Sequence, residues 1–411
     1  MLRPVPGLIA LLLATLSTHA AAPADWPQWR GPNRDGVSTE TGLLDKWPTD
    51  GPRLAWKTSG LGAGFSSVTL AGDRIFTAGD IDDASFVIAL NRADGSLVWK
   101  TKLGRTGGDP PGPRGTPSVA DGLVFALGQH GDLVCVAAAT GQEVWRKSLA
   151  RDFGGQCGGW LYSESPLLDG DRVICTPGGR QGTLVALDRK TGALRWRCSE
   201  WTDSAEYSSP IIGTLGGIRQ YIQLTGQSVA GIAAYSGKLL WRAERAGRTA
   251  IVPTPISSSD LIYVTSGYGV GCNLFRVSSA GTAFKVEPVY ANRDMVNHHG
   301  GVIRVGKYVY GHSDSKGWLC QELETGRVVW SNHGVGKGAV ACADGHLYLR
   351  SESGSGTVAL VRATPDGYQE TGRFDQPDRS GSASWAHPVV AGGRLYLRDQ
   401  GILLCYDVKG N

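Results

Sequence analysis

The sequence predicts an all-β chain that folds as an eight-bladed β-propeller, and two observations carry this prediction. First, a glycine followed four residues later by tryptophan recurs along the chain, at Gly95–Trp99, Gly141–Trp145, Gly192–Trp196, Gly237–Trp241 and Gly326–Trp330. Second, each unit holds four short β-rich runs separated by turn residues such as Asp169-Gly170-Asp171. Four strands in a unit of roughly 40–50 residues are typical of a propeller blade.

Counting these units gives eight blades. Their inner strands are expected to start near Ser66, Gly115, Ser163, Ser208, Pro253, His299, Gly338 and Ala386. The interval between Trp241 and Trp330 holds two units, and its degenerate copy has Ala280-Gly281 with Phe284 near the tryptophan position. The eighth unit lacks its outer strand, whereas residues 53–57 form a strand with Trp56 and no strands before it. We therefore predict that this N-terminal strand completes the last blade and closes the ring.

The N-terminal region divides into two segments before the propeller at residues 53–411. A positive start at Met1 to Arg3, an apolar run over residues 8–16 and small residues up to Ala22 are typical of a secretory signal peptide, residues 1–22. This predicts a soluble protein exported across the inner membrane, either periplasmic or extracellular. Residues 23–52 are expected to form a strap laid across the propeller, because exposed Trp26 and Trp29 in a loose leader would be unfavourable.

The composition excludes several classes of protein. A net charge of +4 with scattered basic residues leaves no electrostatic surface for nucleic acid. No segment after the signal peptide is long and apolar enough to span a membrane, and we expect a monomer. Three of the eight cysteines, Cys135, Cys320 and Cys405, occupy the same place in three repeats, which favours small buried side chains over disulfides. Cys157 and Cys198 are the candidates for an exception.

The repeat resembles that of a known family. The run Ala186-Leu187-Asp188-Arg189-Lys190-Thr191-Gly192-Ala193-Leu194-Arg195-Trp196 is similar to the tryptophan-docking motif of the pyrroloquinoline quinone (PQQ) repeat propellers. These include quinoprotein alcohol dehydrogenases and BamB-type outer-membrane assembly factors. The resemblance covers residues 53 to the end. It implies that the tryptophans pack flat between neighbouring blades, and this structural role is expected for Trp56, Trp99, Trp145, Trp196, Trp241 and Trp330.

Candidate binding residues gather in the longer connections, which a propeller places at one end of the ring. We call this end the loop-rich face. The side chains expected to bind a ligand or cofactor there are Trp160, Glu164, Arg248, Asn297, His299, Trp385 and His387. The adjacent pair His298-His299 has no third ligand at a fixed spacing, so a hydrogen-bonded scaffold is favoured over a metal site. A ring of buried carboxylates and histidines would nevertheless be a functional candidate, and both interpretations stay open.

Two functions follow from the resemblance. The first is a binding or scaffold propeller without a cofactor, a catalytic residue or a metal, which binds a protein, peptide or small ligand on its loop-rich face. It lacks the lipid-anchor cysteine of the BamB type. The alternative is a PQQ- and calcium-dependent dehydrogenase of alcohols or sugars. That alternative implies Glu164 and Asn297 as calcium ligands, Asp294 as base, and Trp160 or Trp385 as a stacking surface.

Overall fold

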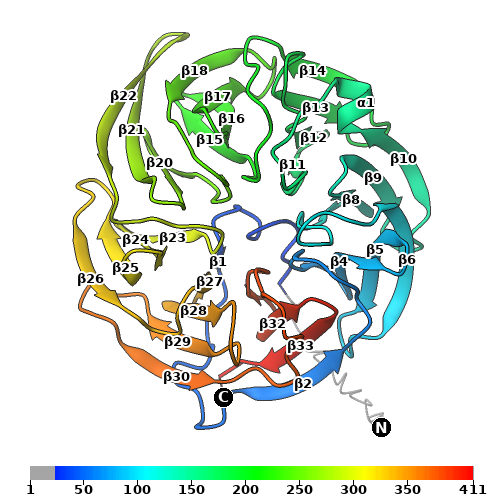
Figure 1. Ribbon diagram of the computed structural model, residues 1–411, viewed down its shortest axis with the longest axis vertical. Helices are drawn as coiled ribbons and strands as arrows, with labels where there is room; N and C mark the ends of the chain where they lie inside the picture. The colour runs from blue at the N-terminus through cyan, green and yellow to red at the C-terminus, as the bar shows by residue number, and fades with distance from the viewer. Residues whose placement is uncertain (1–23, 411) are drawn as a thin grey trace, which may run out of the picture.

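Short strands, nearly all antiparallel, make up almost all of the regular secondary structure in residues 24–410, the part of the chain that the computed structural model describes. Figure 1 shows the sheets arranged as a ring around a central axis. The predicted eight-bladed all-β fold is confirmed. The predicted signal peptide, residues 1–22, lies outside the described residues.

The first four sheets in chain order are built from β3 (Thr69–Ala71), β4 (Arg74–Ile81), β5 (Ala84–Asn91) and β6 (Leu97–Arg105); β7 (Ser118–Ala120), β8 (Leu123–Leu127), β9 (Asp132–Ala137) and β10 (Glu143–Ser148); β11 (Leu167–Asp169), β12 (Arg172–Cys175), β13 (Leu184–Asp188) and β14 (Leu194–Cys198); and β15 (Ile211–Leu215), β16 (Ile218–Leu224), β17 (Ser228–Ala233) and β18 (Leu239–Glu244). A short helix, α1 (Leu149–Phe153), follows β10 and is capped by the Ser148 hydroxyl, which accepts from the Arg151 N–H at 3.3 Å.

The other four sheets are built from β19 (Ile256–Ser258), β20 (Leu261–Ser266), β21 (Gly271–Ala280) and β22 (Ala283–Asn292); β23 (Val302–Val305), β24 (Tyr308–Ser313), β25 (Gly317–Glu322) and β26 (Val328–Asn332); β27 (Gly338–Ala343), β28 (His346–Ser351), β29 (Val358–Arg362) and β30 (Glu370–Phe374), with β1 (Val37–Ser38) added at the inner edge; and β31 (Val389–Val390), β32 (Arg394–Asp399) and β33 (Ile402–Asp407), completed by β2 (Arg53–Thr58).

Ring closure uses both ends of the propeller sequence. Strand β2 pairs antiparallel with β33, from Arg53 opposite Asp407 to Thr58 opposite Leu403. The predicted closure of the last blade by the N-terminal strand is therefore confirmed. A second clasp joins the last sheet to the first, because the buried guanidinium of Arg398 donates to Ser66 O at 3.2 Å and to Ala78 O at 2.5 Å.

The repeated tryptophans lie at the seams between neighbouring sheets. Trp145 donates from Nε1 to Arg189 O of the next sheet at 3.0 Å, and its ring covers Gly192 so closely that a Cβ there would lie 2.8 Å from it. Equivalent Nε1 bonds to the next sheet run from Trp99 to Ala138 O, from Trp196 to Ala234 O and from Trp330 to Thr364 O. The seams of Trp99, Trp145 and Trp196 thus need a glycine in the following turn, because any larger residue there would meet the indole. The Trp330 seam does not, since a Cβ on Gly367 in its following turn would meet nothing within 4 Å.

The degenerate blade uses a different residue at its seam. Tyr290 covers Gly326 and donates from Oη to Leu323 O at 2.8 Å, so Tyr290 and not Phe284 occupies the docking position. The expectation that Phe284 lies near this position was wrong because the β21–β22 hairpin is long and carries Gly281 and Phe284 outward. A Cβ on Gly281 would meet nothing within 4 Å. Trp241 accordingly donates to Gln220 Oε1 of its own sheet at 2.7 Å.

The strap crosses the centre of the ring, where Figure 1 shows it as the dark blue segment. Trp26 exchanges two backbone hydrogen bonds of 2.9 Å with Leu70 of the first sheet, and β1 pairs in parallel with β27. Between these contacts, Arg34 donates to Ser165 O at 2.9 Å and to Pro166 O at 3.1 Å. The strap therefore joins inner strands from opposite sides of the ring and fills the axis.

Candidate functional site

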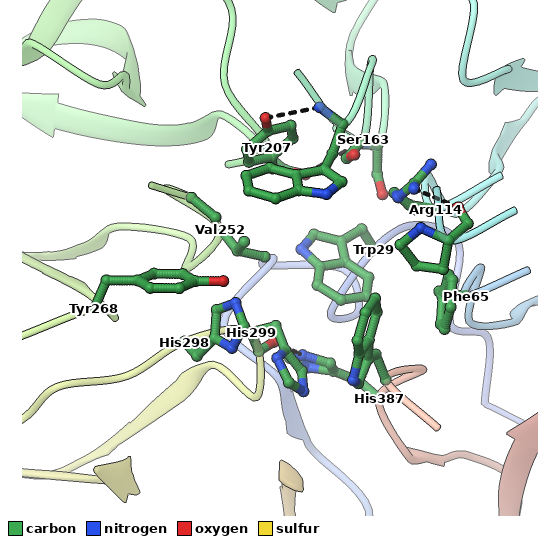
Figure 2. A pocket seen from close by; sticks show the side chains of 16 residues that line it. Trp29, Phe65, Arg114, Ser163, Tyr207, Val252, Tyr268, His298, His299 and His387 are labelled. Atoms are coloured by element: carbon green, nitrogen blue, oxygen red, sulfur yellow. Dashed lines mark hydrogen bonds between the residues drawn. The ribbon is translucent and has the colours of Figure 1, made fainter. Parts of the chain in front are cut away.

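A cavity of about 250 Å³ opens on the axis above the strap. Every connection from an outer strand to the next inner strand contributes to its wall, except the connection between β26 and β27. The lining residues are Trp29, Phe65, Pro110, Arg114, Trp160, Ser163, Ser165, Tyr207, Ser209, Ala250, Val252, Tyr268, His298, His299, Trp385 and His387. Figure 2 shows aromatic rings converging on this space from several blades. A concave site with a largely apolar, aromatic surface and several polar groups in its wall is the usual form of a site for an organic ligand.

The floor of the cavity is made by Trp29 and His387. These two residues also line a smaller space of about 10 Å³ beneath them, together with Trp26 and Arg30, so they separate it from the cavity. Trp29 is held by a hydrogen bond from Nε1 to Thr254 Oγ1 at 3.1 Å, and its ring centroid lies 4.5 Å from that of His387. Burial lowers the pKa of His387 to about 3, which keeps this imidazole neutral.

The walls consist of three aromatic pairs. Trp385 stacks on Phe65 with ring centroids 4.3 Å apart, and Tyr268 meets His298 edge to face at 4.8 Å. In the third pair, Tyr207 Oη accepts the backbone N–H of Trp160 at 3.1 Å, a bond drawn in Figure 2. Trp160 and Tyr268 remain 37% and 41% exposed, so each has ring surface available to a ligand.

The adjacent histidines differ in their charge environments. His299 Nε2 lies 2.5 Å from Glu352 Oε2, and although burial opposes ionisation, this contact holds the pKa of Glu352 below its ordinary value. His298 has no such partner, and burial together with the neighbouring His299 lowers its pKa to about 4. At neutral pH the cavity therefore presents His298 as a neutral imidazole.

Arg114 supplies a positive charge in the cavity wall. Its guanidinium donates to Pro110 O at 2.6 Å and to Gly112 O at 3.2 Å, and burial lowers its pKa. Sequence reasoning missed this residue. The signal that could have found it is the proline-rich run Pro110-Pro111-Gly112-Pro113 just before it, which marks a shaped connection at the loop-rich face.

Four of the predicted site residues line the cavity: Trp160, His299, Trp385 and His387. Glu164 is buried but faces the interior of its blade, where its carboxylate accepts from the N–H and hydroxyl of Thr176 at 2.5 and 2.6 Å. Burial raises the pKa of Glu164 to about 7. Asn297 donates to Gly301 O at 3.1 Å and His312 O at 2.9 Å, and Arg248 is exposed outside the cavity.

The side chains named for the dehydrogenase alternative do not fit a PQQ–calcium centre. Both oxygens of Glu164 are used by Thr176, and Asn297 and Asp294 are not among the lining residues. Asp294 pairs instead with Lys316 at 3.0 Å. Within residues 24–410, no group of three or more His, Cys, Asp or Glu side chains could hold a metal ion. We derive no step through PQQ or calcium from these residues.

All eight cysteines, Cys157 and Cys198 included, are free thiols in this structure. No helix among the described residues has the length and apolar character needed to cross a bilayer.

The fold and the tryptophan seams define a propeller of the PQQ-repeat class. Residues 83–332 match the family model described as outer membrane protein assembly factor BamB. Because this match covers more than half of the chain, the chain belongs to that family, as the resemblance of the repeat indicated. A comparison with curated protein sequences finds no match.

Solved structures of several propellers resemble this one. BamB from Moraxella catarrhalis has a TM-score of 0.62 at 16% identity, over 87% of this chain and 98% of that chain. The quinohemoprotein alcohol dehydrogenase from Comamonas testosteroni has a TM-score of 0.63 at 13% identity, over 94% and 81%. The computationally designed Ika8 protein has a TM-score of 0.60 at 12% identity, over 87% and 100%. At these identities the likeness shows the fold alone.

Proposed function

We propose that the protein is an exported binding protein, which takes a flat and largely apolar group of a small ligand, peptide or protein into the cavity on its loop-rich face. The observation that carries this proposal is the closed floor. Trp29 and His387 line both the cavity and the smaller space below it, so these two side chains stand between the two spaces and offer a ligand an aromatic surface at the base of the cavity. Its walls come from the connections of several blades, so a bound group could contact more than one blade at once.

Binding in this pocket needs little rearrangement of the wall. Trp29 is held by Thr254, Trp385 by its stack on Phe65, and the backbone of Trp160 by Tyr207. Fixed aromatic surfaces lose little conformational entropy when a ligand arrives, which favours binding of a flat ring. The same rings would serve a side chain of a protein partner or a free small molecule.

The proposal is tested with indole as a neutral flat probe. We expect saturable binding by saturation-transfer NMR and calorimetry, and an affinity at least 10-fold lower in Val252→Trp, because this substitution places an indole in the cavity. Val289→Trp is the matched control, since Val289 is 42% exposed on the outer strand β22 and lies outside the cavity. Absence of indole binding, or equal loss in both variants, would contradict the proposal.

The same assay includes PQQ with calcium chloride. We expect no calcium-dependent binding, given the contacts already made by Glu164 and Asn297. Calcium-dependent binding of PQQ coupled to oxidation of an alcohol would overturn the proposal in favour of the dehydrogenase. Export is checked separately by expressing the full chain and measuring the mass of the periplasmic product, which should start after Ala22.

A further inference from the structure

We propose that the cavity recognises a small aromatic monocarboxylate, with the ring against the aromatic walls and the carboxylate on Arg114. This inference rests on the proposed binding function and specifies its ligand class. It depends on three features of the cavity. The guanidinium of Arg114 is fixed and has no ion-pair partner in the part of the chain that the structure describes, a hydroxyl in the same wall has no hydrogen-bond partner there, and the apolar space is large enough for a bicyclic ring.

The guanidinium of Arg114 is oriented by the backbone of its own connection. Two of its N–H groups donate to Pro110 O and Gly112 O, and the rest of the five N–H donors of this lining arginine have no hydrogen-bond partner among the described residues. A guanidinium fixed in this way presents parallel N–H donors, the geometry that binds a carboxylate through both oxygens. A flexible lysine at the surface would not be ordered before the ligand binds.

The charge of Arg114 has no direct counter-ion. Within residues 24–410, none of the ion pairs includes Arg114, and the charges of Asp80 and Asp109 act on it only from a longer distance. Asp80 is itself used by Gln129 Nε2 and by the N–H of Gly107, each at 3.1 Å. A half-buried cation without a carboxylate is unfavourable, so an anionic ligand would offset its desolvation.

A second polar group lies in the same wall. Ser163 lines the cavity, and its Oγ is buried without a hydrogen-bond partner among the described residues. Figure 2 shows Ser163 and Arg114 at one end of the cavity, away from Tyr268 and His298. A hydroxyl can donate to a carboxylate oxygen, so Ser163 would satisfy part of the anion while Arg114 neutralises it.

The rest of the cavity determines how many charges the ligand carries. At the opposite end His298 is neutral at pH 7, and the carboxylate of Glu352 beside His299 would repel a second anion. The space of about 250 Å³ exceeds the roughly 150 Å³ apolar cavity that accommodates benzene. One carboxylate on a one- or two-ring aromatic group is the chemistry that fits these conditions.

The test compares indole-3-acetate with its neutral amide, indole-3-acetamide, by calorimetry on the full propeller. We expect the carboxylate to bind at least 10-fold more tightly than the amide, and this ratio to fall to about one in Arg114→Gln. Arg180→Gln is the matched control, because Arg180 is an exposed arginine in the connection between β12 and β13. It should retain the ratio of the unsubstituted protein. Thermal melts of both variants establish that they are folded.

The outcomes separate this inference from the proposed function. If indole and the amide bind as tightly as the carboxylate, or if Arg180→Gln removes the ratio as Arg114→Gln does, carboxylate recognition by Arg114 is refuted while the binding function stands. If none of the three indoles binds, the proposed function fails and this inference fails with it. Arg114→Lys separates the contribution of charge from that of guanidinium geometry. We expect this variant to keep only part of the preference for the carboxylate over the amide, because lysine retains the charge but not the paired N–H donors.

Discussion

Gly192 lies at the seam between the second and third sheets, and we predict that adding one methyl group to it lowers the free energy of unfolding. This glycine has φ of 68°, and a Cβ on it would lie 2.8 Å from Cδ2 of Trp145. Gly192→Ala therefore combines a left-handed backbone conformation, which costs a non-glycine residue about 1–2 kcal/mol, with overpacking against the indole, which costs about 1–3 kcal/mol. We expect the free energy of unfolding to fall by about 2–5 kcal/mol.

Gly170 provides a control in the same sheet. It lies in the turn between β11 and β12 with φ of 57°, and a Cβ there would meet nothing within 4 Å. Gly170→Ala should therefore cost only the backbone part, about 1–2 kcal/mol. Both free energies are measured by urea unfolding followed by circular dichroism. Equal losses in the two variants would show that the contact between Trp145 and Gly192 adds nothing to stability, and would refute the seam as described.

Three further predictions concern buried groups. Trp145→Ala should lower the free energy of unfolding by about 3–5 kcal/mol. The control Val144→Ala, at a residue that is 48% exposed, should change this free energy by less than about 1 kcal/mol. Similar urea midpoints for the two variants would contradict the docking role of Trp145. Arg398→Met should lower the free energy of unfolding by about 3 kcal/mol or more, because it removes the guanidinium that donates to Ser66 O and Ala78 O. An unchanged free energy in the same unfolding assay would show that these hydrogen bonds do not stabilise the contact between the last and first sheets. Glu164→Gln should gain stability relative to the unsubstituted protein as pH rises. The folded pKa of Glu164, about 7, exceeds the ordinary 4.5, so its stabilising contribution is complete below about pH 4.5 and is lost as pH rises through 7. The two stability curves should therefore diverge by about 2–3 kcal/mol between about pH 5 and pH 8, and parallel curves would argue against a buried, protonated Glu164.

The repeat made the fold predictable from the sequence. Each blade is a local hairpin structure, so its strands and glycine turns depend on residues close in the chain, and the spacing from Gly192 to Trp196 repeats visibly. Ring closure was also predictable, because the strand around Trp56 had no partners nearby and the last blade lacked one strand. The prediction failed locally at Phe284, where a longer hairpin moved the expected position outward and Tyr290 took its place.

The site was only partly predictable, because it depends on the direction of side chains from distant blades. The sequence placed Trp160, His299, Trp385 and His387 in the loop-rich connections, and all four line the cavity. It could not show that Glu164, one residue past a lining position, faces Thr176 instead of the axis. A single residue of register reverses the direction of a side chain near a strand entry, and no local pattern records which direction faces the axis.

The sequence by itself determined the class of fold, the number of blades and the closing strand, because these follow from short-range periodicity and from counting. Only the tertiary structure decided that Trp29 of the strap becomes the floor of the pocket and that Arg114 stands in its wall with no counter-ion among residues 24–410. Trp29 meets Thr254 across 225 residues of sequence. Contacts of such separation arise when the ring closes around the strap, and for that reason they cannot be read from neighbours along the chain.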